Sequence, residues 1–100
     1  YAVTRPLAFH PDVADEVDEV YRWYEGRRPD LGDDFLAALE AVDRGLAATP
    51  EMHQVVEGEV RRSVLRRFPY CVYYRIRPDR VEVIAVQHGR RDPDGWRQRV

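Results

Sequence analysis

The fold of this chain follows from residues 70–88, whose sequence is YCVYYRIRPDRVEVIAVQH. Successive side chains of a β-strand point to opposite faces, and the stretch from Tyr70 to Arg77 alternates in this way. One face is expected to carry Tyr70, Val72, Tyr74 and Ile76, and the other Cys71, Tyr73, Arg75 and Arg77. Pro78-Asp79 is typical of a turn, so the pattern predicts a β-hairpin whose second arm runs from Val81 to His88.

The second arm of this hairpin is apolar on both faces, which predicts a strand inside the sheet. Its expected faces carry Val81, Val83 and Ala85 on one side and Ile84 and Val86 on the other. A preceding strand is expected over Val60–Arg67, but its inward face stays unassigned because Val60 and Leu65 fall on opposite sides. With residues 51–59 as a loop, the C-terminal part becomes a three-stranded antiparallel meander.

The N-terminal part has helical periodicity. The first apolar stripe comprises Val13, Val17, Val20, Tyr21 and Tyr24, and the second comprises Leu31, Phe35, Ala38, Leu39, Val42 and Leu46. The first helix is expected to start at Pro11 and to stop within residues 26–29, and the second to end before Pro50. A short strand over Val3–Phe9 precedes them, confined to a sheet edge by Pro6. We therefore predict one α+β domain over residues 1–100, with an antiparallel helix hairpin packed on one face of the sheet.

Charge is strongly segregated along the chain, although its net value is only −2. Residues 1–59 hold five arginines against fourteen acidic residues, whereas residues 60–100 hold eleven arginines against four. Lysine is absent, so every basic side chain is a guanidinium, which binds carboxylate or phosphate bidentately. Because the acidic first helix repels phosphate, an anionic partner is expected to meet the surface of residues 60–99.

Several classes of protein are disfavoured. No apolar run approaches the ~20 residues of a membrane span, and the apolar segment of a signal peptide is missing, so we expect a cytoplasmic protein without membrane contact. The chain begins with Tyr1 rather than Met, and we expect further residues before it in the complete protein. Cys71 is a single cysteine and predicts a buried, reduced thiol. His10, His53 and His88 have no Cys or Asp at ligand spacing, so neither a metal nor another cofactor is expected.

A series of short motifs resembles the RelE/ParE superfamily of toxins from type II toxin–antitoxin systems, over nearly the whole chain. The motifs are Trp23-Tyr24-Glu25, Leu31-Gly32-x-x-Phe35-Leu36, Val60-Arg61-Arg62, Phe68-Pro69-Tyr70-x-Val72-Tyr73-Tyr74 and His88-x-Arg90-Arg91-Asp92-Pro93-x-x-Trp96. The resemblance implies a small growth-arresting protein that a cognate antitoxin neutralises, and contact with operator DNA only through that antitoxin. It leaves the target open, because the superfamily contains both ribosome-dependent mRNA endonucleases and inhibitors of DNA gyrase.

A nuclease needs a base, an acid and cations around the scissile phosphate. The candidates for proton transfer are His88, Glu57 and Glu59, and those for charge are Arg62, Arg90 and Arg91. The resemblance implies that Arg62 and Arg90 hold the scissile phosphate. Two departures from the nuclease pattern oppose this interpretation. The lysines that part of the group uses are absent, and Trp96 stands where such nucleases often place a tyrosine.

A gyrase inhibitor needs no proton transfer, only a complementary surface, for which arginine and aromatic residues are favoured anchors. The ParE-like branch carries a histidine closely followed by arginine and aspartate, as residues 88–92 do, and we favour it. DNA gyrase is then the expected partner, with the ribosome and its mRNA as the alternative and a non-toxic binding module as a second alternative. The side chains expected to touch the target or a phosphate are Arg61, Arg62, Tyr73, Arg75, Arg90, Arg91 and Trp96.

The same residues are also compatible with purely structural roles. A histidine at a strand end, such as His88, often bonds to backbone, and Trp96 is compatible with anchoring the C-terminal segment on the sheet. The arginines of residues 60–67 are compatible with surface ion pairs to the acidic helices, which contribute only ~0–1 kcal/mol each.

Overall fold

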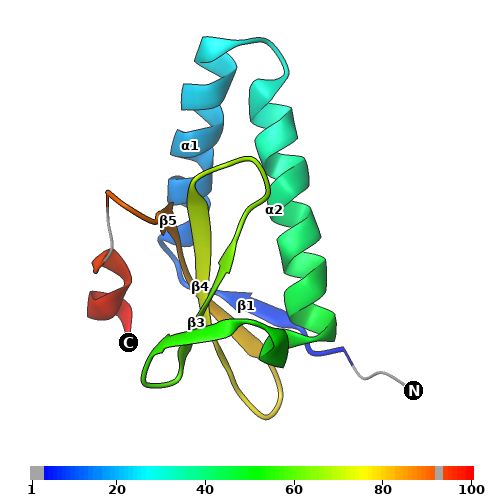
Figure 1. Ribbon diagram of the computed structural model, residues 1–100, viewed down its shortest axis with the longest axis vertical. Helices are drawn as coiled ribbons and strands as arrows, with labels where there is room; N and C mark the ends of the chain where they lie inside the picture. Colours follow the sequence, from blue (N-terminus) through cyan, green and yellow to red (C-terminus); the bar gives the residue numbers. More distant parts are fainter. Residues whose placement is uncertain (1–3, 92–93) are drawn as a thin grey trace.

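The computed structural model describes residues 4–91 and 94–100, and Figure 1 shows their arrangement. The elements are β1 (Leu7–Phe9), α1 (Val13–Arg27), α2 (Leu31–Ala48), a 3-10 helix η1 (Pro50–Met52), β2 (Gln54–Glu57), β3 (Val60–Val64), β4 (Tyr70–Ile76), β5 (Val81–His88) and a 3-10 helix η2 (Gly95–Arg99). The described strands form one sheet in the order β1-β5-β4-β3-β2, with β1 parallel to β5 and the other neighbours antiparallel. The predicted α+β fold is confirmed.

The helix hairpin packs on one face of the sheet through an aromatic cluster. The ring of Phe35 on α2 is completely buried, and its centroid lies 5.7 Å from Phe68 and 5.8 Å from both Tyr24 and Tyr70. The contacts with Phe68 and Tyr70 are edge-to-face, and they add to the large apolar area that aromatic rings remove from water. Tyr74 is also completely buried on this face, as the alternation of residues 70–77 predicts.

The opposite face of the sheet has a smaller core of its own. Tyr73 of β4 and Ala85 of β5 are buried there, and the Trp96 indole of η2 covers them. Because β4 and β5 are covered on both sides, their sequences are apolar on both faces.

A β-bulge changes the predicted faces of β5. Tyr73 lies opposite Ala85 whereas Tyr74 lies opposite Val83, so Ile84 is an extra residue without a partner on β4. An extra residue reverses the alternation beyond it. Val86 therefore joins the helix-covered core, while Ile84 lies on the other face, and their predicted placement on a common face was wrong.

Residues 51–59 form more than the predicted loop, because they contain part of η1 and the edge strand β2. Contacts from distant residues hold this segment in place. The Arg61 guanidinium donates to the carbonyl oxygens of Glu51 (3.0 Å) and His53 (2.8 Å), and the Tyr74 hydroxyl donates to the carbonyl of Pro50 (2.5 Å). The alternation of the local sequence carries no sign of these bonds.

Two predicted strands are shorter in the structure. β1 begins at Leu7, and the expected start at Val3 lies outside the described residues. β3 ends at Val64 rather than at Arg67, because Arg67 adopts a left-handed backbone with φ of 71° and the chain turns there into β4.

The helices follow their predicted stripes, with α1 continuing through Gly26 to Arg27 and α2 starting at Leu31. The turn between them contains Asp30 in a left-handed conformation (φ 69°), which breaks the helical path. Within residues 4–91 and 94–100, no helix has the length and apolar character that crossing a membrane requires.

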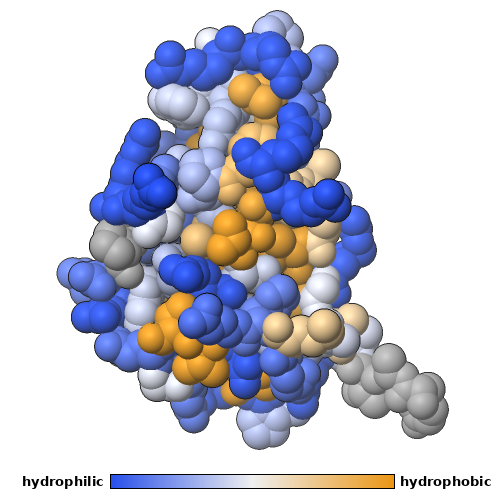
Figure 2. All heavy atoms as spheres, in the orientation of Figure 1, coloured by the Kyte–Doolittle hydropathy of each residue, from blue (hydrophilic) through white to orange (hydrophobic). Residues whose placement is uncertain are grey.

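The surface seen in the orientation of Figure 1 has an apolar region and a hydrophilic region. Figure 2 shows apolar side chains gathered between α2 and β3, and hydrophilic ones at the end formed by the α1–α2 turn. A groove of about 290 Å³ lies in the apolar area, lined by Ala38, Ala41 and Val42 of α2 and by Val64 of β3, which is 56% exposed.

Asp43 on α2 provides a test of the helix packing. Its Oδ1 atom is buried without a hydrogen-bond partner among the described residues, and burial together with the Glu40 charge raises the pKa of Asp43 to about 6. The unfolded chain releases this proton near the ordinary aspartate pKa of 3.8. The folded state therefore loses stability relative to the unfolded state as the pH rises from about 4 to about 6.

We expect Asp43→Asn to stabilise the protein by about 1 kcal/mol at about pH 8, because the amide removes the buried charge at constant size. The gain should shrink as the pH falls toward about 4, where the wild-type carboxyl is protonated in the folded state. Urea unfolding at both pH values measures the effect, and Glu19→Gln serves as a control at an exposed carboxylate. A gain of equal size at both pH values would contradict the assigned cause.

Candidate functional site

The sheet separates Arg62 from His88, the histidine expected to transfer protons in a nuclease site. Arg62 lies opposite Tyr73, which points to the face covered by η2. His88 lies opposite Tyr70, with 5.4 Å between their ring centroids, on the face covered by the helices. Because paired residues share a face, Arg62 and His88 project from opposite sides of the sheet and do not converge on one phosphate.

His88 shapes the turn that follows β5. Its Nδ1 atom accepts hydrogen bonds from the backbone N–H groups of Arg90 (3.1 Å) and Arg91 (3.2 Å). An accepting Nδ1 carries no proton, so the neutral ring holds its proton on Nε2. The imidazole acts as a cap that fixes the turn and leaves the side chains of Arg90 and Arg91 exposed.

Tyr73 and Trp96, two of the predicted contact residues, are buried and are not available at the surface. Their exposed fractions are 2% and 3%, and their rings stack with centroids 5.7 Å apart at an angle of 22°. Burial raises the pKa of Tyr73, and a hydrogen bond with Arg62 partly offsets this. The predicted surface role of both rings was wrong, because η2 folds back and closes over this part of the sheet.

Arg61 and Arg75 are committed to contacts inside the protein. Arg61 bonds the carbonyl groups around η1, as described above. The Nε atom of Arg75 lies 3.5 Å from Glu82, a carboxylate that also receives a 2.6 Å hydrogen bond from Arg77. The hydrogen bond from Arg77 lowers the pKa of Glu82, with Arg75 contributing through its charge. Of the predicted contact residues, Arg90 and Arg91 are the exposed ones.

Arg91 borders a groove of about 310 Å³ between α1 and the end of β5. The other walls come from Trp23 and Glu19 of α1, Tyr70 of β4 and His88 of β5. Trp23 is 47% exposed, so an aromatic ring, a carboxylate and a guanidinium border the same opening. Asp92, which the sequence motif includes, lies outside the described residues.

The histidines do not form a metal site with their neighbours. His10 Nδ1 accepts a hydrogen bond from the backbone of Asp12 (3.1 Å), and His88 Nδ1 is occupied by its turn. Across residues 4–91 and 94–100, no three His, Cys, Asp or Glu side chains are close enough to hold a metal ion.

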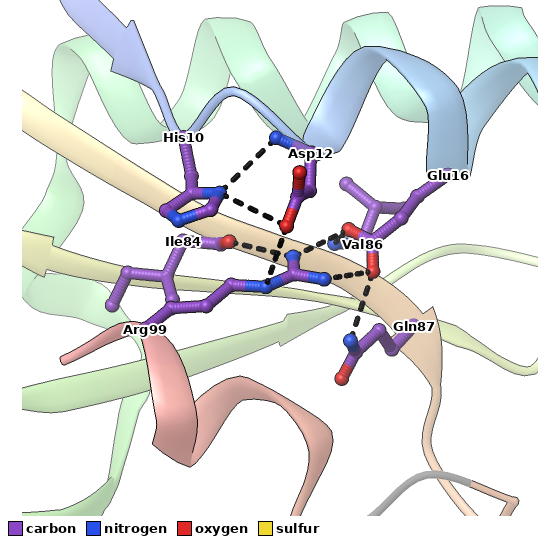
Figure 3. Close-up of polar contacts among 7 residues, drawn as sticks. All are labelled: His10, Asp12, Glu16, Ile84, Val86, Gln87 and Arg99. Carbon is purple, nitrogen blue, oxygen red and sulfur yellow. Dashed lines mark hydrogen bonds and ion pairs between the residues drawn. The ribbon is translucent and has the colours of Figure 1, made fainter.

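The sequence did not predict the Glu16–Arg99 pair, which joins α1 to the C-terminal segment (Figure 3). Two 2.9 Å hydrogen bonds run from the Arg99 guanidinium to the two carboxylate oxygens of Glu16. Glu16 also accepts from the backbone N–H of Val86 (3.1 Å), and Arg99 donates to the carbonyl of Ile84 (3.1 Å). The hydrogen bond to Glu16 raises the pKa of Arg99, and the charges of Glu16 and Asp12 act in the same direction.

The Glu16–Arg99 pair takes the place of a neighbouring strand on the outer edge of β5. The backbone of β1 and the residue after it serve this edge as far as Val83, whose carbonyl accepts from the N–H of His10 (2.8 Å). Beyond that point Glu16 and Arg99 satisfy the next backbone groups. No local pattern reveals a pair 83 residues apart in the chain.

Comparisons with known proteins agree on one family. A sequence model described as the ParE toxin of type II toxin–antitoxin systems, parDE, matches residues 7–93. Toxin ParE2 from two strains of Mycobacterium tuberculosis is 29% identical over 93 residues, covering 92% of this chain and 89% of the relative. A chain of the chromosomal ParDE system from P. aeruginosa shares the fold with a TM-score of 0.74 at 15% identity, covering 85% of this chain and 96% of that chain.

We expect Glu16→Ala to lower the free energy of unfolding by about 3 kcal/mol, because it leaves both Arg99 and the Val86 N–H without their acceptor. Arg99→Ala should cost about 2 kcal/mol, since Glu16 keeps its bonds to β5. Urea unfolding gives both values, and amide exchange at Val86 reports the edge of β5 directly. Glu19→Ala, at an exposed carboxylate of the same helix, should change stability by less than about 0.5 kcal/mol. An unchanged exchange rate at Val86 in Glu16→Ala would refute the edge-capping role.

Proposed function

Because this chain belongs to the family of ParE toxins of type II toxin–antitoxin systems, we propose that it arrests bacterial growth by binding DNA gyrase, without cleaving RNA. We choose gyrase binding over RNA cleavage because the sheet separates Arg62 from His88. A binding protein needs no convergent acid and base, whereas a nuclease does.

The separation of Arg62 from His88 matters because RNA cleavage needs a proton acceptor and a cation at the same phosphate. Attack by a 2′-hydroxyl requires a proton acceptor within hydrogen-bond reach, at roughly 2.6–3.2 Å, while a cation holds the same phosphate. Here the Nδ1 atom of His88 is engaged with its turn, and Arg62 lies beside Tyr73 on the other face. Arg90 is near His88 in the chain but is presented outward by the turn. These contacts favour structural roles for the histidine and for Arg62.

A protein-binding role fits the exposed arginines after β5. Arg90 and Arg91 follow a strand covered on both faces, and His88 caps the backbone that carries them. A guanidinium on a rigid turn loses less conformational freedom on binding than one on a flexible segment. We therefore propose Arg90 and Arg91 as contacts to the gyrase target.

Membership of the family implies an antitoxin partner. We propose that an acidic antitoxin segment neutralises the toxin by covering the basic C-terminal part, where residues 60–100 hold eleven arginines against four acids. Binding to operator DNA is then a property of the antitoxin, and the toxin reaches that DNA only through it. The cytoplasm is the compartment in which such a toxin meets gyrase.

Supercoiling by purified gyrase and transcript cleavage on translating ribosomes, measured side by side with the same toxin preparation, test the proposed target. We expect supercoiling to be inhibited and transcripts to remain intact. Arg62→Ala should leave inhibition within about twofold of wild type, provided that the variant folds. Transcript cleavage that is lost in Arg62→Ala or His88→Ala would overturn the proposal in favour of the nuclease.

The role of the exposed arginines has its own test. Replacing Arg90 and Arg91 together with alanine should weaken inhibition of supercoiling by about tenfold or more, as for anchor residues of an interface. Growth after induction should recover accordingly, and co-expression of the antitoxin from the neighbouring gene should rescue growth for the wild type. The matched control replaces Arg22 and Arg44, two exposed arginines of the helices, and should retain full inhibition. Equal loss in both double variants would exclude a specific role for residues 90 and 91.

A further inference from the structure

Three separate segments that carry arginines lie toward the same end of the molecule (Figure 1). The segments are the α1–α2 turn, the β3–β4 loop and the turn after β5. We call this the distal arginine surface, made of Arg27, Arg28, Arg66, Arg67, Arg90 and Arg91.

Aromatic rings connect the three segments, and the turn after β5 is reached through Tyr70, whose ring centroid lies 6.2 Å from that of Tyr24 and 5.4 Å from that of His88. The Arg27 guanidinium lies 4.4 Å from the centre of the Trp23 ring, and Trp23 contacts Tyr24 with 5.0 Å between centroids. Tyr24 in turn contacts Phe68, over which the Arg67 guanidinium lies at 5.7 Å. The cations therefore surround one packed aromatic group rather than separate flexible loops.

The positive charge of this surface is only partly neutralised. Arg28 and Arg67 share a single carboxylate, Asp34, at 3.4 and 3.9 Å. Their side chains remain 57% and 67% exposed. Arg66, Arg90 and Arg91, all exposed, form no ion pair with any carboxylate of residues 4–91 and 94–100.

The backbone at Arg67 points independently to a use for its side chain. Its φ of 71° lies in the left-handed region, which glycine adopts freely and other residues adopt at a cost in free energy. Inside the protein the side chain gains one exposed 3.9 Å ion pair and one distant ring contact, which offset little of this cost. Strain retained without compensation nearby is characteristic of functional positions.

We propose that the distal arginine surface binds an acidic segment of a protein partner, with Arg67 as an anchor. Carboxylates fit the unneutralised guanidiniums, and the half-exposed Trp23 offers an apolar contact beside them. Asp30 and Asp34 lie within the surface and Asp18 and Glu19 lie along α1, so a continuous phosphate chain meets repulsion that a mixed protein segment avoids. This inference rests on the proposed function in one respect only, namely that the partner is a protein.

The test measures binding of a fluorescent peptide of alternating glutamate and leucine, and of a short DNA duplex, to the full chain. We expect peptide binding to weaken by about tenfold in a variant combining Arg67→Glu and Arg91→Glu. The variant combining Arg22→Glu and Arg44→Glu has the same net charge and should bind within about twofold of wild type. Equal weakening in both variants, or preference for the duplex at equal ionic strength, would overturn the proposal.

A pair of substitutions at Arg67 separates its side chain from its backbone. Arg67→Ala and Arg67→Gly should weaken peptide binding equally, but only Arg67→Gly should raise the melting temperature, because glycine relieves the left-handed strain. A lower melting temperature for Arg67→Gly than for Arg67→Ala would remove the strain as support and count against the proposal.

The peptide-binding test and the supercoiling test can give opposite results, so the two proposals can fail independently. If peptide binding maps to this surface while supercoiling is unaffected by wild-type toxin, the acidic-partner inference stands and the gyrase target fails. If wild type inhibits supercoiling but peptide binding does not map to this surface, the reverse holds.

Discussion

The pairing of Glu16 with Arg99 is the contact on which the rest of the structure depends. β5 has a strand on one edge along its whole length, but on the other edge β1 serves it only as far as Val83. A strand edge inside a packed protein leaves backbone groups that must find partners, or the fold loses the free energy of their hydration. One carboxylate and one guanidinium meet this need and at the same time tie α1 and η2 to the sheet.

In this arrangement the sheet lies between two hydrophobic cores, one on each face. The bulge at Ile84 and the stacking of Trp96 on Tyr73 close the face that would otherwise be open. Two of the expected contact rings become structural, and His88 and Arg62, the histidine and arginine considered for a nuclease site, lie on different faces of the sheet. What remains at the surface is cationic and carried by turns, which suits recognition of a partner better than proton transfer.

Sequence periodicity predicted the helix pair, the β4–β5 hairpin and the inward side of Tyr74, because burial imposes a regular pattern on consecutive residues. It failed for residues 51–59, where Val55 and Val56 do not alternate and where Arg61 and Tyr74 hold the backbone from a distance. The prediction from periodicity also gave the wrong faces for β5 beyond Ile84, because a single unpaired residue reverses the alternation and leaves no signal in the composition.

By itself, the sequence determined the helix pair, the β4–β5 hairpin, the main side chains of the helix-covered core and the concentration of arginine after residue 60, since each is a property of neighbouring residues. Only the tertiary structure decided which arginines are free. A guanidinium is bound by whichever carbonyl or carboxylate the fold brings to it, so Arg61 and Arg99 are used internally, while Arg90 and Arg91 form no ion pair with the residues that the structure describes. Those partners come from distant parts of the chain, where spacing in the sequence says nothing about distance in space.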